Sequence, residues 1–253
     1  MAYQKYFTMS FDDGLEQDKR IIQILDRYRL QCTFNLNAGL FGTQKRIGRI
    51  GNMGFLEYPE GSSGFKTRFK NHDHHRIPVD EIAQVYEGFE IASHGYRHEA
   101  LALIKPEQME ESIRKDIEAL SKLTGYPIVG HAYPGGASSA RVASCLKKHG
   151  AIYAREVLGT GSFSFPQDPL RYRATSMVLD KKLFALADQF IAAESQADDL
   201  LFYVWGHGYE LDFGTELASW ERFEKFCEKI ADQKDIVYCT NKQAFEGHLQ
   251  VGR

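Results

Sequence analysis

The sequence predicts one α/β domain built on a parallel sheet, either open or closed into a barrel. Segments with strand patterns alternate with segments whose apolar residues recur at helical spacing. Polar residues of the kinds used in catalysis stand just past several strand segments, where parallel α/β folds build their sites. The chain has 253 residues, of which 43% are hydrophobic, and this is enough to bury the core of one such domain.

Seven segments carry the strand pattern. The first is rich in aromatic and β-favouring residues, and the second alternates Cys32, Phe34 and Leu36. The sixth is a continuous apolar run, as expected of a buried parallel strand. In chain order, the predicted strands cover residues 3–10, 31–36, 89–93, 128–133, 151–154, 200–205 and 236–240.

Helix patterns fill the intervals between these strands. Ile21, Leu25 and Tyr28 form one face of the first helix, and Pro106 opens a longer helix with Met109 on its apolar face. The other predicted helices cover about residues 80–88 with Asp80 as the cap, 141–148, 182–191, 217–230, and a last segment capped by Asn241.

The stretch from about residue 42 to 72 breaks this alternation, because its glycines recur at no regular spacing. We predict a single domain over residues 1–253 with an irregular insertion at about 42–72, a length typical of functional or mobile loops. A polar cluster of His72, Asp73, His74 and His75 follows it. This cluster lacks the spacing of a closed metal site, and a polar lead-in to the next helix explains it more simply.

Charge and cysteine usage exclude several classes of function. The formal net charge of −3 gives no general attraction to nucleic acid or to an anionic membrane. The four cysteines form no Cys-x-x-Cys pair and sit in stretches typical of buried thiols. No apolar run is long enough to span a bilayer, and the first residues lack a secretory pattern, so we expect a cytoplasmic protein. These features leave the oligomeric state open.

Two motifs together predict a metal site. Asp12 and Asp13 are adjacent at the end of the first strand, and His94 and His98 are spaced i, i+4 after the third. The four side chains supply oxygen and nitrogen ligands for one divalent metal with a carboxylate left over, which is a means of activating water. Taken singly, Asp-Asp-Gly is also an ordinary turn, and two histidines at this spacing are also common without a metal.

Two further positions are candidates for catalysis. His207 follows the apolar sixth strand between two glycines, so its imidazole is approachable and suited to a general acid. A buried histidine bonded to backbone is an equal alternative. The Tyr133-Pro134-Gly-Gly turn offers backbone N–H groups that can hold an oxyanion, or it is simply a strand-to-helix turn.

Four motifs in this order resemble those of the polysaccharide deacetylase family, also called the NodB-homology group or carbohydrate esterase family 4. They are residues 10–14 (Ser-Phe-Asp-Asp-Gly), 94–98 (His-Gly-Tyr-Arg-His), 131–136 (His-Ala-Tyr-Pro-Gly-Gly) and 205–207 (Trp-Gly-His). The resemblance implies a distorted (β/α)₇ barrel, in agreement with the seven predicted strands.

The resemblance also implies the roles of individual residues. Asp12 would be the catalytic base, His207 the acid, and the N–H of Tyr133, before Pro134, the oxyanion donor. The metal would be held by Asp13, His94 and His98. Zinc is the first choice for this metal, with cobalt, nickel and manganese as alternatives.

The chain departs from the family pattern in two places. Ala132 stands two residues before the proline, where the family usually carries an arginine that pairs with the catalytic carboxylate. Arg155, at the end of the fifth predicted strand, is our candidate for the replacement. The four motifs above correspond to the first, second, third and last motifs of the family. The family's fourth motif is not recognisable in this chain, so the acid that would orient His207 is unassigned.

The expected activity is removal of an acetyl group from an N-acetylated sugar or a related substrate. Hydrolysis of another small amide, a cyclic ureide or an ester on the same site is the alternative. A second alternative is a barrel that binds carbohydrate without turning it over, although such a binder has no need for a base and an acid.

Overall fold

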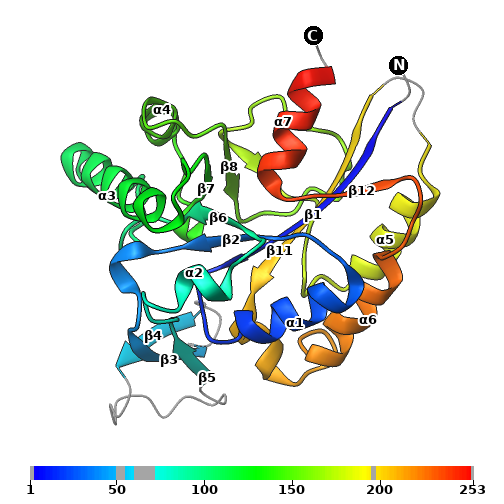
Figure 1. Cartoon of the computed structure of the whole chain (residues 1–253), viewed down its shortest axis with the longest axis horizontal. Coiled ribbons are helices and arrows are strands. Elements are labelled where there is room, and N and C mark those ends of the chain that lie inside the picture. The colour runs from blue at the N-terminus through cyan, green and yellow to red at the C-terminus, as the bar shows by residue number, and fades with distance from the viewer. Residues whose placement is uncertain (1–2, 50–54, 60–71, 195–197, 252–253) are drawn as a thin grey trace.

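The computed structural model describes residues 3–49, 55–59, 72–194 and 198–251, which form one large parallel sheet, one small antiparallel sheet and surrounding helices (Figure 1). The large sheet has nine strands in the order β10-β11-β1-β2-β6-β7-β8-β9, with β12 also paired to β1. Its strands are β1 (Lys5–Asp12), β2 (Thr33–Leu36), β6 (Glu90–Ser93), β7 (Gly130–Ala132), β8 (Tyr153–Glu156), β9 (Tyr172–Arg173), β10 (Ser176–Met177), β11 (Leu200–His207) and β12 (Ile236–Tyr238).

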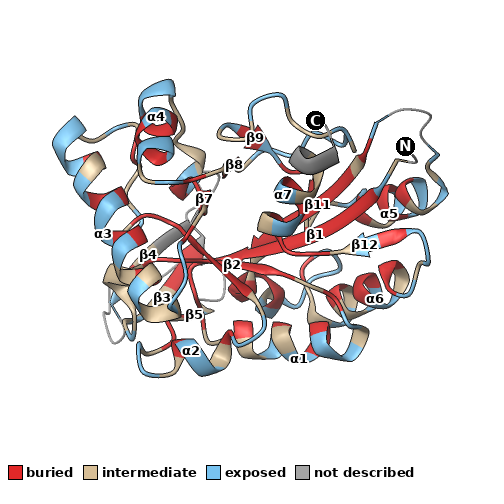
Figure 2. Ribbon diagram, turned by 45° about the horizontal axis from the view of Figure 1, so that its top comes forward, coloured by how far each residue is buried: buried red, intermediate tan, exposed pale blue. Residues whose placement is uncertain are grey.

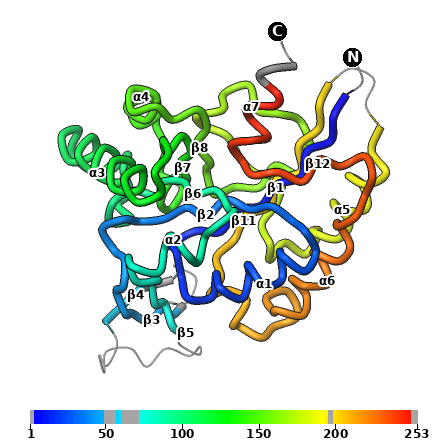
Figure 3. Tube along the Cα trace, in the orientation of Figure 1, coloured from blue at the N-terminus to red at the C-terminus, as the bar shows by residue number. Residues whose placement is uncertain are grey.

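All pairings within the large sheet are parallel, and the sheet curls into an open half-barrel. The predicted fold class is therefore confirmed, and each of the seven predicted strands is present. The strands β9 and β10 were not predicted, because two residues are too few to show an alternating pattern. The first strand and the last helix lie side by side in space (Figure 3).

In the described ranges, seven α-helices and three 3₁₀ turns lie between or after the strands. They are α1 (Asp18–Tyr28), α2 (Ile82–Val85), α3 (Pro106–Thr124), α4 (Ala140–Lys148), α5 (Leu183–Ala192), α6 (Trp220–Ile230), α7 (Asn241–Val251), η1 (Ala38–Leu40), η2 (Pro134–Gly136) and η3 (Gly208–Phe213). None of the helices in the described ranges is long and apolar enough to cross a membrane.

The central strand β1 shows how the sequence divides the core. All eight of its residues are buried (Figure 2). Phe7, Met9 and Phe11 belong to the large apolar cluster shared with the helices, whereas Tyr6 belongs to a second cluster that includes Phe245 of α7. Successive side chains on a strand point to opposite faces. The strand is therefore covered on both sides, and only its carboxyl end is left for a polar site.

Two predicted helix caps are wrong. The short helix α2 is preceded by Glu81 rather than Asp80, and no side chain caps it. The amide of Asn241 accepts a hydrogen bond from Thr8 and donates one to Tyr203, so it is used inside the barrel. The hydroxyl of Thr240 instead accepts the N–H of Gln243 at the start of α7.

The insertion expected to be irregular over residues 42–72 contains strands where it is described. β3 (Gln44–Arg49) pairs antiparallel with both β4 (Phe55–Pro59) and β5 (His72–His75), and we call these three strands the accessory sheet. The prediction was wrong for these residues because polar side chains occupy both faces of β3, so no alternation of apolar and polar residues marks it. The rest of residues 42–72 lies partly outside the described residues.

The accessory sheet is joined to the main body beside the end of β1. The N–H of Ile77 donates to the carbonyl of Gly14, and the N–H of Glu16 donates to the carbonyl of His75. Ile47 of β3 packs in a small apolar cluster with Leu15. The chain that follows Asp13 is therefore held against the accessory sheet.

Candidate active site

The carboxyl ends of neighbouring strands bring the candidate residues together. Asp12 and His207 end β1 and β11 and are directly paired in register. Asn35 of β2 pairs with Asp12 on its other side, and His94 follows β6. Parallel strands that start at one edge of a sheet also end at one edge. Residues up to 195 positions apart in the chain thus face a common point.

Asp12 is held by an arginine. The Nη2 atom of Arg155 lies 2.6 Å from Oδ1 and 2.5 Å from Oδ2 of Asp12, and Asn35 donates to Oδ1 at 2.7 Å. The guanidinium stacks over the ring of Trp205, 4.2 Å from its centroid. Burial by itself would raise the pKa of Asp12, but the charges of Arg155, His94 and His207 together outweigh it and the pKa is lowered. Asp12 is therefore an ionised carboxylate.

Asp13 has partners of its own and shares His94 with Asp12, whose Oδ2 lies 3.9 Å from Nε2 of that histidine. The backbone of Asp13 is left-handed, with φ of 80°, which turns its side chain away from that of Asp12. Its Oδ1 atom lies 3.8 Å from Nε2 of His94 and 3.6 Å from Nε2 of His98. Among the described residues, these three side chains offer ligand atoms that all lie within 4.8 Å of one another. The structure brings together the predicted ligand set.

His94 is prepared to act as a ligand. Its Nδ1 lies 2.8 Å from the carbonyl oxygen of Ala132, which can only accept, so Nδ1 carries the proton. The lone pair is then on Nε2, which is buried and has no hydrogen-bond partner in the described part of the chain. Burial lowers the pKa of His94 to about 4. A neutral imidazole whose second nitrogen is fixed by a carbonyl is the usual arrangement of a metal-binding histidine.

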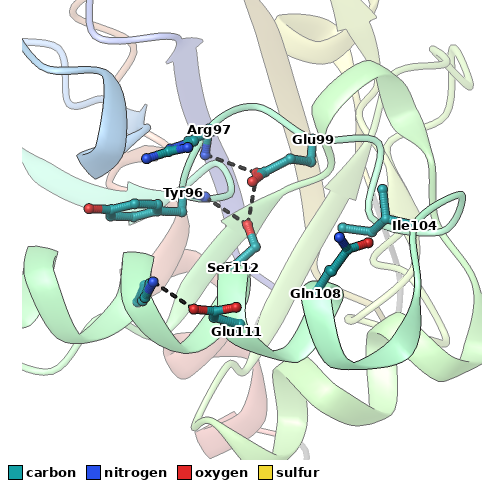
Figure 4. Close-up of a pocket in the computed structure, with 8 residues that line it drawn as sticks. Tyr96, Arg97, Glu99, Ile104, Gln108, Glu111 and Ser112 are labelled. Carbon is teal, nitrogen blue, oxygen red and sulfur yellow. Dashed lines mark hydrogen bonds and ion pairs between the residues drawn. The ribbon is translucent and has the colours of Figure 1, made fainter.

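The loop that carries His98 is a turn rather than the helical turn considered from the spacing. Gly95 and His98 both have positive φ, of 74° and 58°. The carboxylate of Glu99 accepts from the N–H of Arg97 and from the hydroxyl of Ser112 on α3 (Figure 4). The same hydroxyl accepts the N–H of Tyr96. These bonds brace the loop beside a shallow pocket of about 350 Å³.

Glu210 is the acid that the sequence left unassigned for His207. Its Oε2 lies 3.4 Å from Nδ1 of His207 and accepts the backbone N–H of the same residue at 3.1 Å. The opposite nitrogen, Nε2, lies 4.0 Å from Asp12. Burial opposes the charge on His207, but Glu210 and Asp12 outweigh it and raise the pKa of His207 to about 9. His207 thus carries a proton at neutral pH.

The expected oxyanion donor is not free. The N–H of Tyr133 donates to the carbonyl of Arg155 at 2.9 Å, as part of the pairing between β7 and β8. The phenol of Tyr133 donates to the carbonyl of Leu170, and Pro134 has no N–H to offer. The predicted role of this N–H as an oxyanion donor is therefore corrected, because the N–H is already hydrogen-bonded within the sheet.

His74 is the residue that the sequence analysis missed. Its ring is buried between Asp13 and Glu57, with Nε2 3.2 Å from Oδ2 of Asp13. The guanidinium of Arg76 lies 3.7 Å from Oδ1 of the same carboxylate. The only signal in the sequence was the polar cluster at residues 72–75, which has no spacing relation to Asp13. The accessory sheet makes this contact, and that sheet was not predicted.

One known protein family matches the part of the chain that carries the predicted ligands. Residues 2–154 match the model of the family described as polysaccharide deacetylase, which is more than half of the chain. The chain belongs to the polysaccharide deacetylase family. The matched stretch contains Asp12, Asp13, His94 and His98, whereas Arg155 and His207 lie beyond its end.

Among curated proteins, the peptidoglycan deacetylase-like protein FGM2 of Gibberella zeae is 27% identical to this chain over 128 residues. The aligned stretch covers 51% of this chain and 37% of that relative. The chain thus spans little more than a third of the length of the curated relative that it matches.

Solved structures show the same fold in other polysaccharide deacetylases and related esterases. The peptidoglycan deacetylase PdaC of Bacillus subtilis superposes with a TM-score of 0.55 at 14% identity, covering 98% of this chain and 93% of its own. A family 4 acetyl xylan esterase of Clostridium thermocellum, with a cobalt ion, gives a TM-score of 0.54 at 13% identity over 95% and 90%. A Mycobacterium smegmatis protein assigned to this family gives a TM-score of 0.59 at 15% identity, covering 100% of this chain and 92% of its own.

Proposed function

We propose that this chain is a metal-dependent hydrolase that removes an acetyl group from the nitrogen of an acetylated sugar. One observation carries the proposal: two adjacent carboxylates differ in their partners, although Nε2 of His94 lies within 4 Å of both. Asp12 pairs with Arg155 and faces His207, whereas Asp13 faces His94 and His98. A base, an acid and a ligand set at one strand edge are what hydrolysis of an amide needs.

The residues present fit a divalent metal. Oδ1 of Asp13 and Nε2 of His94 are buried polar atoms with no hydrogen-bond partner among the described residues. Such orphaned atoms are costly unless an ion or water satisfies them. One carboxylate and two imidazoles suit zinc, and cobalt, nickel or manganese are alternatives. When bound there, the ion polarises the acyl carbonyl and lowers the pKa of water.

The remaining side chains move protons. Asp12, ionised and held by Arg155 and Asn35, accepts the proton of the attacking water. His207, protonated through the influence of Glu210, donates a proton to the leaving amine. An amine leaves poorly unless it is protonated, so the second transfer is needed for cleavage of the C–N bond. Nε2 of His207, the acid, lies 4.0 Å from Oδ2 of Asp12, the base. The C–N bond of the substrate would lie between this pair on one side and the metal ligands on the other.

A panel of substrates tests this proposal. We expect turnover of N-acetylated amino sugars and their oligomers that depends on added divalent metal and is lost in Asp12→Asn. Turnover confined to acetyl esters or to cyclic ureides would replace the proposal by the second activity on the same site. Tight binding of carbohydrate with no turnover of any substrate would instead support a non-catalytic barrel.

The metal content provides an independent measurement. Protein purified without added ions should contain about one equivalent of a divalent metal, and Asp13→Ala should contain far less, because one of three protein ligands is lost. Equal metal content in the two proteins would contradict the assigned ligand set. The identity of the bound metal would decide among zinc, cobalt, nickel and manganese.

A further inference from the structure

A histidine of the accessory sheet lies between two carboxylates. Nδ1 of His74 is 2.7 Å from Oε1 of Glu57, and Nε2 is 3.2 Å from Oδ2 of Asp13. The side chain of His74 is only 3% exposed. Carboxylate oxygens of this kind accept hydrogen bonds, so the ring nitrogen that faces Asp13 is positioned to donate. The result is a chain of contacts that runs from β4 through β5 to the end of β1.

This contact divides the two oxygens of Asp13. Oδ2 is taken by His74, whereas Oδ1 has no hydrogen-bond partner in the described ranges and faces His94 and His98. If no donor held Oδ2, the carboxylate of Asp13 could rotate about χ2, a torsion with a broad energy minimum. A donor fixed on Oδ2 therefore aims the lone pairs of Oδ1 at the two imidazoles.

His74 is itself held firmly. Its backbone pairs with Lys45 of β3, and its ring packs edge-on against Tyr209, with centroids 5.1 Å apart. Glu57, behind the ring, also accepts from Lys45 at 2.7 Å and from Arg76 at 2.5 Å. These contacts come from the accessory sheet, from Arg76 directly after β5, and from the turn after His207. The accessory sheet is thus a rigid support for one side of the site.

We propose that His74, backed by Glu57, is a positioning residue that orients Asp13 as a metal ligand, so that the accessory sheet is part of the metal site. The inference rests on the metal site of the proposed function and adds to it the hydrogen bond that holds Oδ2 of Asp13. Partners of this kind commonly change metal affinity by about 10–100-fold when they are removed.

Two substitutions at the same position test the inference. In His74→Gln the amide nitrogen takes nearly the place of Nε2 and still reaches Asp13. In His74→Asn the amide nitrogen takes nearly the place of Nδ1 and reaches only Glu57. Zinc affinity is measured by competition with a chelating dye, and the absorption spectrum of the cobalt-loaded protein reports the ligand geometry. His149→Gln, directly after the end of α4, where the ring lies near Glu110, serves as a distant control.

We expect His74→Asn to bind zinc about 10–100-fold more weakly than the wild type and to change the cobalt spectrum. His74→Gln and His149→Gln should stay close to the wild type in both measurements. A merely structural role would weaken both His74 variants equally, and that result would overturn the inference. Unchanged affinity in both His74 variants would overturn it as well.

The outcomes separate this inference from the proposed function. If the wild type binds zinc and hydrolyses acetyl groups while both His74 variants match it, only the inference is lost. If the wild type binds zinc but turns over no substrate, the activity is wrong and the affinities still decide the role of His74. If the wild type binds zinc no more tightly than Asp13→Ala, both the inference and the proposed function are wrong. Should His74→Asn fail to fold, wild-type affinity and spectrum in His74→Gln support the inference, and weakened affinity there overturns it.

Discussion

The guanidinium of Arg155 donates to both oxygens of Asp12, although 143 positions separate the two residues. Both side chains are buried, at 0% and 2% exposure. Arg155 is paired in register with Ala132, which occupies the place where an arginine is expected from the family motif. The cation that holds the carboxylate of Asp12 therefore comes from the neighbouring strand, and the small side chain of Ala132 stands opposite it.

Replacing Arg155 by methionine should lower turnover by about 10²-fold, because Asp12 loses its fixed orientation. The metal content should equal that of the wild type, since Arg155 contacts Asp12 and not Asp13. Arg173→Met, at an exposed position of the neighbouring strand β9, is the matched control. Full activity in Arg155→Met would show that Asp12 does not depend on this ion pair.

Removing the imidazole of His207 should separate chemistry from metal binding. His207 lies near Asp12 and is not part of the ligand cluster, so His207→Ala should retain the metal. Loss of a general acid slows turnover by about 10²–10⁴-fold. Single-turnover rates and metal content, measured on the same preparation, check both expectations. A variant that works normally would exclude His207 as the acid.

Glu210 should set the pH range in which His207 is protonated. The carboxylate favours the charged imidazole, and the pKa of His207 is raised to about 9. In Glu210→Gln this pKa falls, so the protonated form is lost at lower pH. The alkaline limb of the kcat profile should move down by on the order of one pH unit. An unmoved limb would mean that another group gives the proton.

Asp18 should make the stability of the metal-free protein depend on pH. Burial raises the pKa of this carboxyl to about 8, and Oδ2 accepts the N–H of Leu15 and the hydroxyl of Tyr86. In the unfolded chain the carboxyl ionises near pH 4. Its contribution to stability is therefore complete below about pH 4 and is lost as the pH rises through about 8.

Asp18→Asn removes this titration and keeps a side-chain oxygen for both hydrogen bonds. The free energy of unfolding of the wild type, relative to that of the variant, should therefore fall between pH 5 and pH 8. Urea unfolding at several pH values measures the difference. Parallel curves for the two proteins would mean that Asp18 ionises normally in the folded state.

The strand ends were accessible to sequence reasoning because alternation and apolar runs mark the strands. Parallel strands place their carboxyl ends at one edge of the sheet. The sequence alone therefore predicted that four side chains lie close together: Asp12, Asp13, His94 and His207. Glu210 was also within reach, because it stands three residues after His207. The family's fourth motif is not recognisable in this chain, so the resemblance did not point to Glu210.

Other contacts depend on tertiary structure. His74 reaches Asp13 across 61 positions through an antiparallel sheet, and β3, which pairs with the strand of His74, carries polar side chains on both faces. The N–H of Tyr133 is taken by a neighbouring strand, and no local pattern reveals which strand that is.

Local periodicity and residue chemistry were enough to predict the fold class, the strand edge and a candidate set of metal ligands. The different surroundings of the two adjacent carboxylates, with Arg155 on Asp12 and His74 on Asp13, follow only from the packing of distant strands. A carboxylate takes its role from the charges packed around it. Those charges come from distant strands whose register the local sequence does not encode.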